Sequence, residues 1–148
     1  MLNRRKALGL GVAACLLPAR VLAATDVVMA VDGVALGGID PLSYWLDGEP
    51  RLGDPTHRIL WRDAMWHFAD SDRLAAFERN PRGLSPAYGG YCAYALSQGI
   101  VVASDPEVFS MVENRLFLNQ THLIRQAWLS DVPGHVASAD ANWPQILG

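Results

Sequence analysis

Cys92 is the only cysteine in residues 24–148, and this limits how the chain can hold a fold together. A single thiol cannot close an internal disulfide, so the fold has to rest on an apolar core. The sequence supplies one, because 51% of its residues are hydrophobic and five are tryptophan. Four roles remain open for the thiol: a buried small side chain, a reactive group, a metal ligand or a link between two chains.

The residues before position 24 have the composition of a secretory signal peptide. A basic start, Met1–Lys6, precedes an uncharged stretch, Ala7–Ala19, and the segment Val21–Ala23 suits signal peptidase. The stretch is too short for a membrane span. We therefore expect residues 1–23 to be a signal peptide, and residues 24–148 to act in the periplasm or outside a bacterial cell.

Two features leave the export route open. Arg4 and Arg5 resemble a twin-arginine motif, which directs folded proteins across the membrane. Val12–Cys15 resembles a lipobox, which would make Cys15 a lipidated N-terminus and anchor the protein. Both routes place the chain outside the cytoplasm.

The expected mature chain is acidic. The signal peptide would remove four of the 12 basic residues and none of the 15 acidic ones, which leaves eight arginines and a net charge of about −7. An acidic domain without a basic stripe is a poor match for nucleic acid or anionic membranes. The expected partner is a small ligand or a metal ion, with no nucleic acid and no membrane span, and no protein partner is indicated.

Alternating apolar residues predict two short β-hairpins. One pairs residues 58–61 with 65–68 around a turn at Arg62-Asp63, and the other pairs 108–112 with 115–118. Helices are expected after Asp40-Pro41, from Ser71 as cap to Arg79, from Cys92 to Leu96, after Asn119 as cap, and for one or two turns within residues 133–147. No internal repeat is recognised. The sum is a small single domain of the α+β class, with short β-hairpins packed against short helices.

Several segments resemble the YHS domain family, in its stand-alone secreted branch. They are Gly38–Tyr44, Ala64–Ala69, Tyr88–Tyr94, Arg115–Asn119 and Asp140–Pro144, so the resemblance spans nearly all of residues 24–148. It implies a YHS-like fold. Cysteine-rich relatives, similar to metallochaperone domains, are regarded as metal-binding. In those relatives three thiols stand where this chain has Asp40, Ala69 and Arg73, so a closed structural zinc site cannot be transferred to it.

Cys92 falls near the start of a predicted helix, where unpaired backbone N–H groups favour a thiolate. Three tyrosines surround it in the sequence, and a Gly-Gly pair would let a ligand approach the backbone. Burial in the core is a strong competing interpretation, because free cysteine is among the most buried residue types. The candidate ligand-binding residues are Cys92, Tyr88, Tyr91, Tyr94, Gly89 and Gly90.

His67 and Met65 share one face of a predicted strand, and a soft Cys/His/Met set would suit copper. The candidate metal ligands are therefore Cys92, His67 and Met65, and the cofactor is either copper or another soft transition metal. A lone histidine in a strand is more often structural. The other histidines, among them His135, are expected in solvent.

No catalytic set is apparent, because Ser97 and Ser110 lack a recognisable base. The leading hypothesis is an exported YHS-domain binding module that takes a soft metal, or a small ligand, near Cys92. One alternative is a thiol redox protein that uses Cys92. The other is a non-catalytic accessory or interaction domain. An enzyme is the least supported interpretation.

Overall fold

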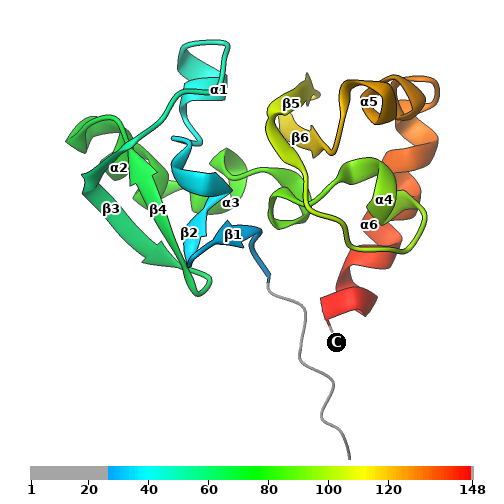
Figure 1. Ribbon diagram of the computed structural model, residues 1–148, viewed down its shortest axis with the longest axis horizontal. Coiled ribbons are helices and arrows are strands. Elements are labelled where there is room, and N and C mark those ends of the chain that lie inside the picture. Colours follow the sequence, from blue (N-terminus) through cyan, green and yellow to red (C-terminus); the bar gives the residue numbers. More distant parts are fainter. Residues whose placement is uncertain (1–26, 148) are drawn as a thin grey trace, which may run out of the picture.

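Two β-hairpins, each followed by a covering helix, organise the computed structural model, which describes residues 27–147 (Figure 1). The predicted signal peptide and Cys15 lie outside the described residues. The fold is the expected small α+β domain. Its elements are β1 (Ala30–Val31), β2 (Val34–Ala35), η1 (Leu36–Gly38), α1 (Ser43–Leu46), β3 (Asp54–Trp61), β4 (Ala64–Phe68), α2 (Ser71–Arg79), α3 (Pro81–Leu84), η2 (Ala87–Gly90), α4 (Ala93–Ser97), β5 (Asp105–Val112), β6 (Arg115–Asn119), α5 (His122–Leu129) and α6 (Val132–Leu147).

The first predicted hairpin is confirmed. β3 and β4 pair antiparallel within a four-stranded sheet of order β1-β2-β4-β3, with Leu60 opposite Met65. Arg62 and Asp63 both have positive φ, 52° and 59°, as a two-residue type I′ turn requires. The strand begins at Asp54, earlier than the sequence predicts, and the short strands β1 and β2 are not predicted at all.

Aromatic rings fill the space between hairpin and helix in both halves of the molecule. In the first half, the ring centre of Phe77 on α2 lies 5.2 Å from that of Trp66 and 5.1 Å from that of Phe68. In the second half, Trp128 of α5 lies 5.0 Å from Phe117. All five side chains are buried. Burying a large apolar side chain contributes about 1.5–3 kcal/mol, so these contacts attach each helix to its hairpin.

The second hairpin repeats the first about 51 residues later along the chain. β5 and β6 have 8 and 5 residues, as β3 and β4 do, and the register shifts after the first pair in both, at Asp54 and at Asp105. The turn residues Glu113 and Asn114 again have positive φ. Residues 35–86, the first unit, and residues 87–137, the second unit, are therefore two copies of one structural element.

The equivalence extends beyond the hairpins. Each unit opens with three residues of positive φ, Leu36–Gly38 at 54°, 62° and 93°, and Tyr88–Gly90 at 57°, 62° and 89°. In each unit the residue before the main helix accepts a hydrogen bond from the N–H three residues on, Asp70 in α2 and Thr121 in α5. The structure thus contains an internal repeat where none is recognised in the sequence. Few residue types coincide between the units, so the repeat is visible mainly in the backbone.

Helix boundaries differ from the sequence prediction at three places. Asp70, not Ser71, caps α2, because its carboxylate accepts the hydrogen bond of the Arg73 N–H. Asn119 does not cap α5 but ends β6 in the core. The C-terminal segment forms one helix of 16 residues, α6, where one or two turns are predicted. Within residues 27–147, no helix has both the length and the apolar character needed to cross a bilayer.

A buried carboxylate joins three segments of the first unit. Asp40 is fully buried, and its Oδ1 accepts a hydrogen bond from the Leu42 N–H at 2.8 Å. Its Oδ2 accepts hydrogen bonds from the Ala69 N–H at 3.0 Å and from Arg73 Nη1 at 3.1 Å. Arg73 also binds the exposed carboxylate of Asp47 with both terminal nitrogens, at 2.8 Å each. The arginine thereby links α2 to the end of α1.

Replacing Asp40 by alanine is expected to lower the free energy of unfolding by about 3 kcal/mol, because Arg73 and two backbone N–H groups lose a buried partner. Guanidinium-induced unfolding measures this. Asp47→Ala is the matched control, since it removes an exposed partner of the same arginine and should cost much less. Equal losses from the two variants would contradict this account.

Candidate functional site

Cys92 is a core residue in this structure. It immediately precedes α4, as predicted, but its side chain is 1% exposed. Its Sγ lies 3.5 Å from Oδ1 of Asn119, which is itself fully buried. The backbone N–H of Cys92 donates to the carbonyl of Val102 at 2.9 Å. The thiol is thus enclosed between α4 and β6, and it lines none of the clefts described below.

The candidate metal ligands are not brought together. Met65 and His67 are half-buried on β4 in the first unit, whereas Cys92 lies at α4 in the other half of the molecule (Figure 1). Within residues 27–147, no group of three or more His, Cys, Asp or Glu side chains is placed to hold a metal ion. The three positions that have thiols in the resembling domains do converge, but in this chain they form the contacts of Asp40 with Ala69 and Arg73.

Two of the candidate tyrosines pack against α6. The ring centre of Tyr91 lies 6.1 Å from that of Trp143. The ring centre of Tyr94 lies 5.2 Å from that of His135, in an edge-to-face arrangement. These contacts hold the C-terminal helix on the second unit, a structural role for both rings.

The Gly-Gly pair is explained by close packing of the chain on itself. Gly89 and Gly90 have φ of 62° and 89°, a region in which side chains are strained. A Cβ on Gly89 would lie 1.9 Å from the carbonyl oxygen of Val27, and one on Gly90 would lie 2.7 Å from Cδ2 of Leu36. The Gly89 carbonyl accepts a hydrogen bond from the Met29 N–H at 2.9 Å. The close approach expected here is therefore made by the N-terminal segment.

The structure gives Ser97 a histidine neighbour that the sequence does not predict. Oγ of Ser97 lies 3.1 Å from Nδ1 of His135, which is half-buried against Tyr94 and not fully in solvent. However, the Ser97 hydroxyl is only 2.6 Å from the carbonyl oxygen of Tyr94, to which it donates its proton. Neither residue lines a cleft described below. The pair joins α4 to α6 and does not form a nucleophile with its base.

A cleft of about 370 Å³ opens where the two units meet. We call it the inter-unit cleft. Its walls carry four aromatic side chains, and three arginines line it as well. The aromatic residues are Trp61, Trp66, Tyr88 and Trp143, and the arginines are Arg62, Arg82 and Arg115. Of the predicted site residues, Tyr88 and Gly89 line this cleft, and Cys92 does not.

Two of the three arginines have no compensating acid among the residues that the structure describes. Within residues 27–147, Arg62 and Arg82 have no carboxylate within salt-bridge distance. The guanidinium of Arg62 stacks over the Trp61 ring, 4.8 Å from its centre. Partial removal from water, together with the charge of Arg82, lowers the pKa of Arg62. The cleft is thus a cationic place in an acidic protein.

Arg115 is held in place by α6. Its two terminal nitrogens bind the carboxylate of Asp140 at 2.9 and 3.0 Å, and these hydrogen bonds raise the pKa of Arg115 and lower that of Asp140. Asp140 also accepts the hydroxyl proton of Tyr88 at 2.8 Å. Burial, and then this bond, raises the pKa of Tyr88. Tyr88, Arg115 and Asp140 are thus joined at one wall of the cleft, and the charges of Arg115 and Asp140 cancel.

The cleft is not predicted from the sequence, because its residues come from separate segments. Arg62 lies in the first hairpin turn, Arg82 in α3, Arg115 at the start of β6 and Trp143 in α6. One signal was available: residues 24–148 contain only eight basic residues, all arginines, and Arg62 directly follows a tryptophan. That signal does not indicate which of the arginines meet.

The comparisons with known proteins add no family to this description. No protein-family model, no curated protein and no solved structure matches the chain.

Because Cys92 is buried, we expect its thiol to react slowly with thiol reagents in the folded protein. In a Cys15→Ser chain, Cys92 is expected to react with 5,5′-dithiobis(2-nitrobenzoate) only as fast as the protein opens, and at once in guanidinium. Absorbance of the released thiolate measures both rates, and the unfolded sample is the control. Immediate stoichiometric labelling of the folded protein would contradict the burial described here.

Proposed function

We propose that this chain is an exported, non-catalytic YHS-type module that binds a small ligand in the inter-unit cleft. One observation carries this proposal: aromatic rings from both units and from α6 line a single recess of about 370 Å³, together with two arginines of the first unit that have no carboxylate partner among residues 27–147. Ligand sites are typically clefts of about 300–1,000 Å³, with apolar walls and a few polar groups, and they lie preferentially where two structural units meet.

Fewer observations support the metal-binding, redox and accessory-domain hypotheses. A soft metal at Cys92 would need ligands from side chains that lie in different halves of the molecule. A redox thiol would need access to its partner, and the Cys92 side chain is 1% exposed. A non-catalytic accessory domain could have the same structure. It would differ from the proposed module in binding no ligand in the cleft. Export rests on the composition of residues 1–23 alone.

The five tryptophans provide a test within the chain itself. Trp61, Trp66 and Trp143 line the cleft, whereas Trp45 and Trp128 do not. In ¹⁵N-labelled protein, millimolar indole or benzoate is expected to shift the indole N–H resonances of the cleft tryptophans. The resonances of Trp45 and Trp128 act as internal controls and should stay in place.

A Trp143→Ala variant is expected to bind the same probe at least tenfold more weakly, because it removes one wall of the cleft. Unchanged cleft resonances with both probes would remove the proposal, and so would uniform shifts of all five tryptophans.

A further inference from the structure

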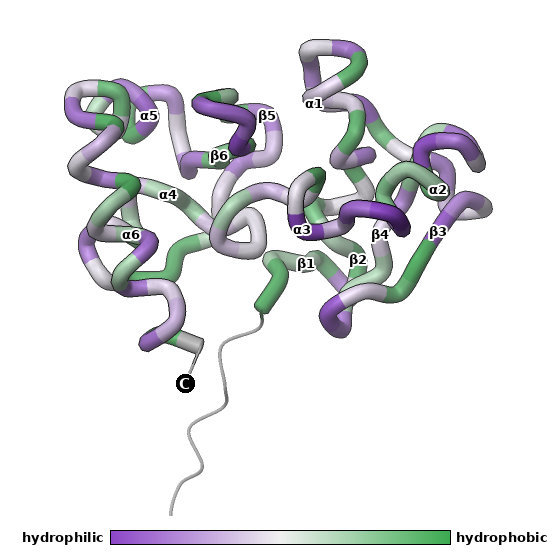
Figure 2. The backbone as a smooth tube through the Cα atoms, turned by 180° about the vertical axis from the view of Figure 1, so that it is seen from behind, coloured by the Kyte–Doolittle hydropathy of each residue, from purple (hydrophilic) through white to green (hydrophobic). Residues whose placement is uncertain are grey.

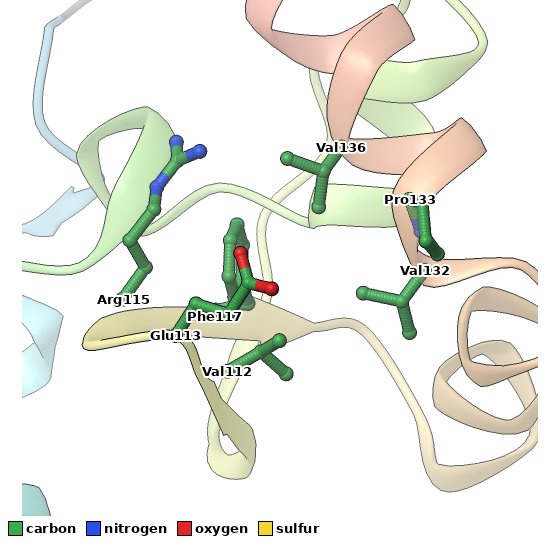
Figure 3. Close-up of a pocket in the computed structure, with 7 residues that line it drawn as sticks. All are labelled: Val112, Glu113, Arg115, Phe117, Val132, Pro133 and Val136. Atoms are coloured by element: carbon green, nitrogen blue, oxygen red, sulfur yellow. The ribbon is translucent and has the colours of Figure 1, made fainter.

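The two units place a recess at the same position, which allows a direct comparison. The second unit contains a pocket of about 230 Å³ between the β5–β6 turn and the start of α6 (Figure 3). Val132 and Val136 face Val112 and Phe117 across it. Counting back 51 residues from its lining gives Pro81, Ser85, Trp61 and Trp66, and the last three of these line the inter-unit cleft. We call the pocket of about 230 Å³ beside the β5–β6 turn the second-unit pocket.

The frame around both recesses is the same. In the first unit, Oδ1 of Asn80 accepts a hydrogen bond from the Gly83 N–H at 3.1 Å as α3 begins. In the second unit, Oδ1 of Asp131 accepts one from the Gly134 N–H at 3.1 Å as α6 begins. Each recess therefore lies between a type I′ hairpin turn and a helix start capped by the same type of bond. The difference between them is one of side chains.

The side chains differ most in charge. Arg62 occupies the turn position of Glu113, and Arg82 occupies the position of Pro133. At these two positions the inter-unit cleft has two cations, whereas the second-unit pocket has a carboxylate and a proline; Arg115 lines both. Both cations lie on exposed, hydrophilic segments, the β3–β4 turn and α3, and α3 lies between the two halves of the molecule in both views (Figures 1 and 2).

Two neighbouring guanidinium groups without an acid repel each other. A compact oxyanion placed between them would relieve this repulsion, and guanidinium groups bind carboxylate and phosphate oxygens with paired hydrogen bonds. The aromatic side chains of Trp61, Trp143 and Tyr88 also line the cleft, and they supply the apolar contact that a planar ring needs. The aromatic rings and the arginines line one continuous cleft, so a single ligand that has both a ring and an anionic group can contact both at once.

We propose that the inter-unit cleft selects a small aromatic oxyanion, with the ring against the tryptophans and the anionic group on Arg62 and Arg82. This inference rests on the proposed ligand-binding function of the same cleft and names the chemical class of the ligand. A carboxylate and a phosphate share the required chemistry.

The test is a calorimetric titration with four probes: benzoate, phenyl phosphate, benzyl alcohol and acetate. The first two carry both ring and anion, and the last two carry one each. Benzoate or phenyl phosphate is expected to bind at least tenfold more tightly than benzyl alcohol and acetate. Which of the two binds better identifies the anionic group.

The double variant Arg62→Gln/Arg82→Gln is expected to lose this tenfold preference, so that benzoate and phenyl phosphate bind no more tightly than benzyl alcohol. Arg58→Gln is the control, because Arg58 is an exposed arginine of β3 that does not line the cleft. Benzyl alcohol binding as tightly as benzoate, or a preference that survives in the double variant, would overturn this inference and leave ligand binding in the cleft intact. No binding of any probe would overturn both.

Discussion

A two-stranded hairpin is at best marginally stable in water, and it becomes part of a fold only when one of its faces is covered. This constraint organises the whole protein. Each hairpin is followed after two residues by a helix, and a buried aromatic residue of that helix, Phe77 or Trp128, covers the inner face of the strands. The chain builds this arrangement twice. The two copies leave a cleft between them, and α6 supplies its last wall.

The repeat also explains the lone cysteine. Cys92 lies two residues after the positive-φ residues Tyr88–Gly90, as Asp40 does after Leu36–Gly38, so the two residues occupy equivalent positions in the two units. In the first unit, Asp40 accepts the hydrogen bond of the Leu42 N–H. In the second unit, the equivalent N–H of Tyr94 is bound at 3.0 Å by Oδ1 of Asn119, the same oxygen that lies next to the thiol. A small buried thiol and a neighbouring amide thus replace a buried carboxylate, so the position of Cys92 has a structural cause.

The sequence alone predicts the local elements well and the site poorly. Both hairpins, the turn at Arg62-Asp63 and the helix ending at Arg79 follow from alternation and turn residues that lie within a few positions of each other. The repeat is missed because units with few residues in common share mainly backbone geometry. The cleft is missed because Arg62, Arg82 and Trp143 meet only after the two units dock. Of the residues that the sequence singles out as a possible ligand site, Tyr88 and Gly89 line this cleft and Cys92 does not.

The central claim is that the cleft between the two units, and not the cysteine, is the place where a ligand meets this protein. Intermolecular nuclear Overhauser effects from bound benzoate test it most directly, because they report which protons touch the ring. This account predicts contacts to the indole protons of Trp61 and Trp143. Contacts to Val112 and Val136 of the second-unit pocket instead, or to the side chains around Cys92, would contradict it.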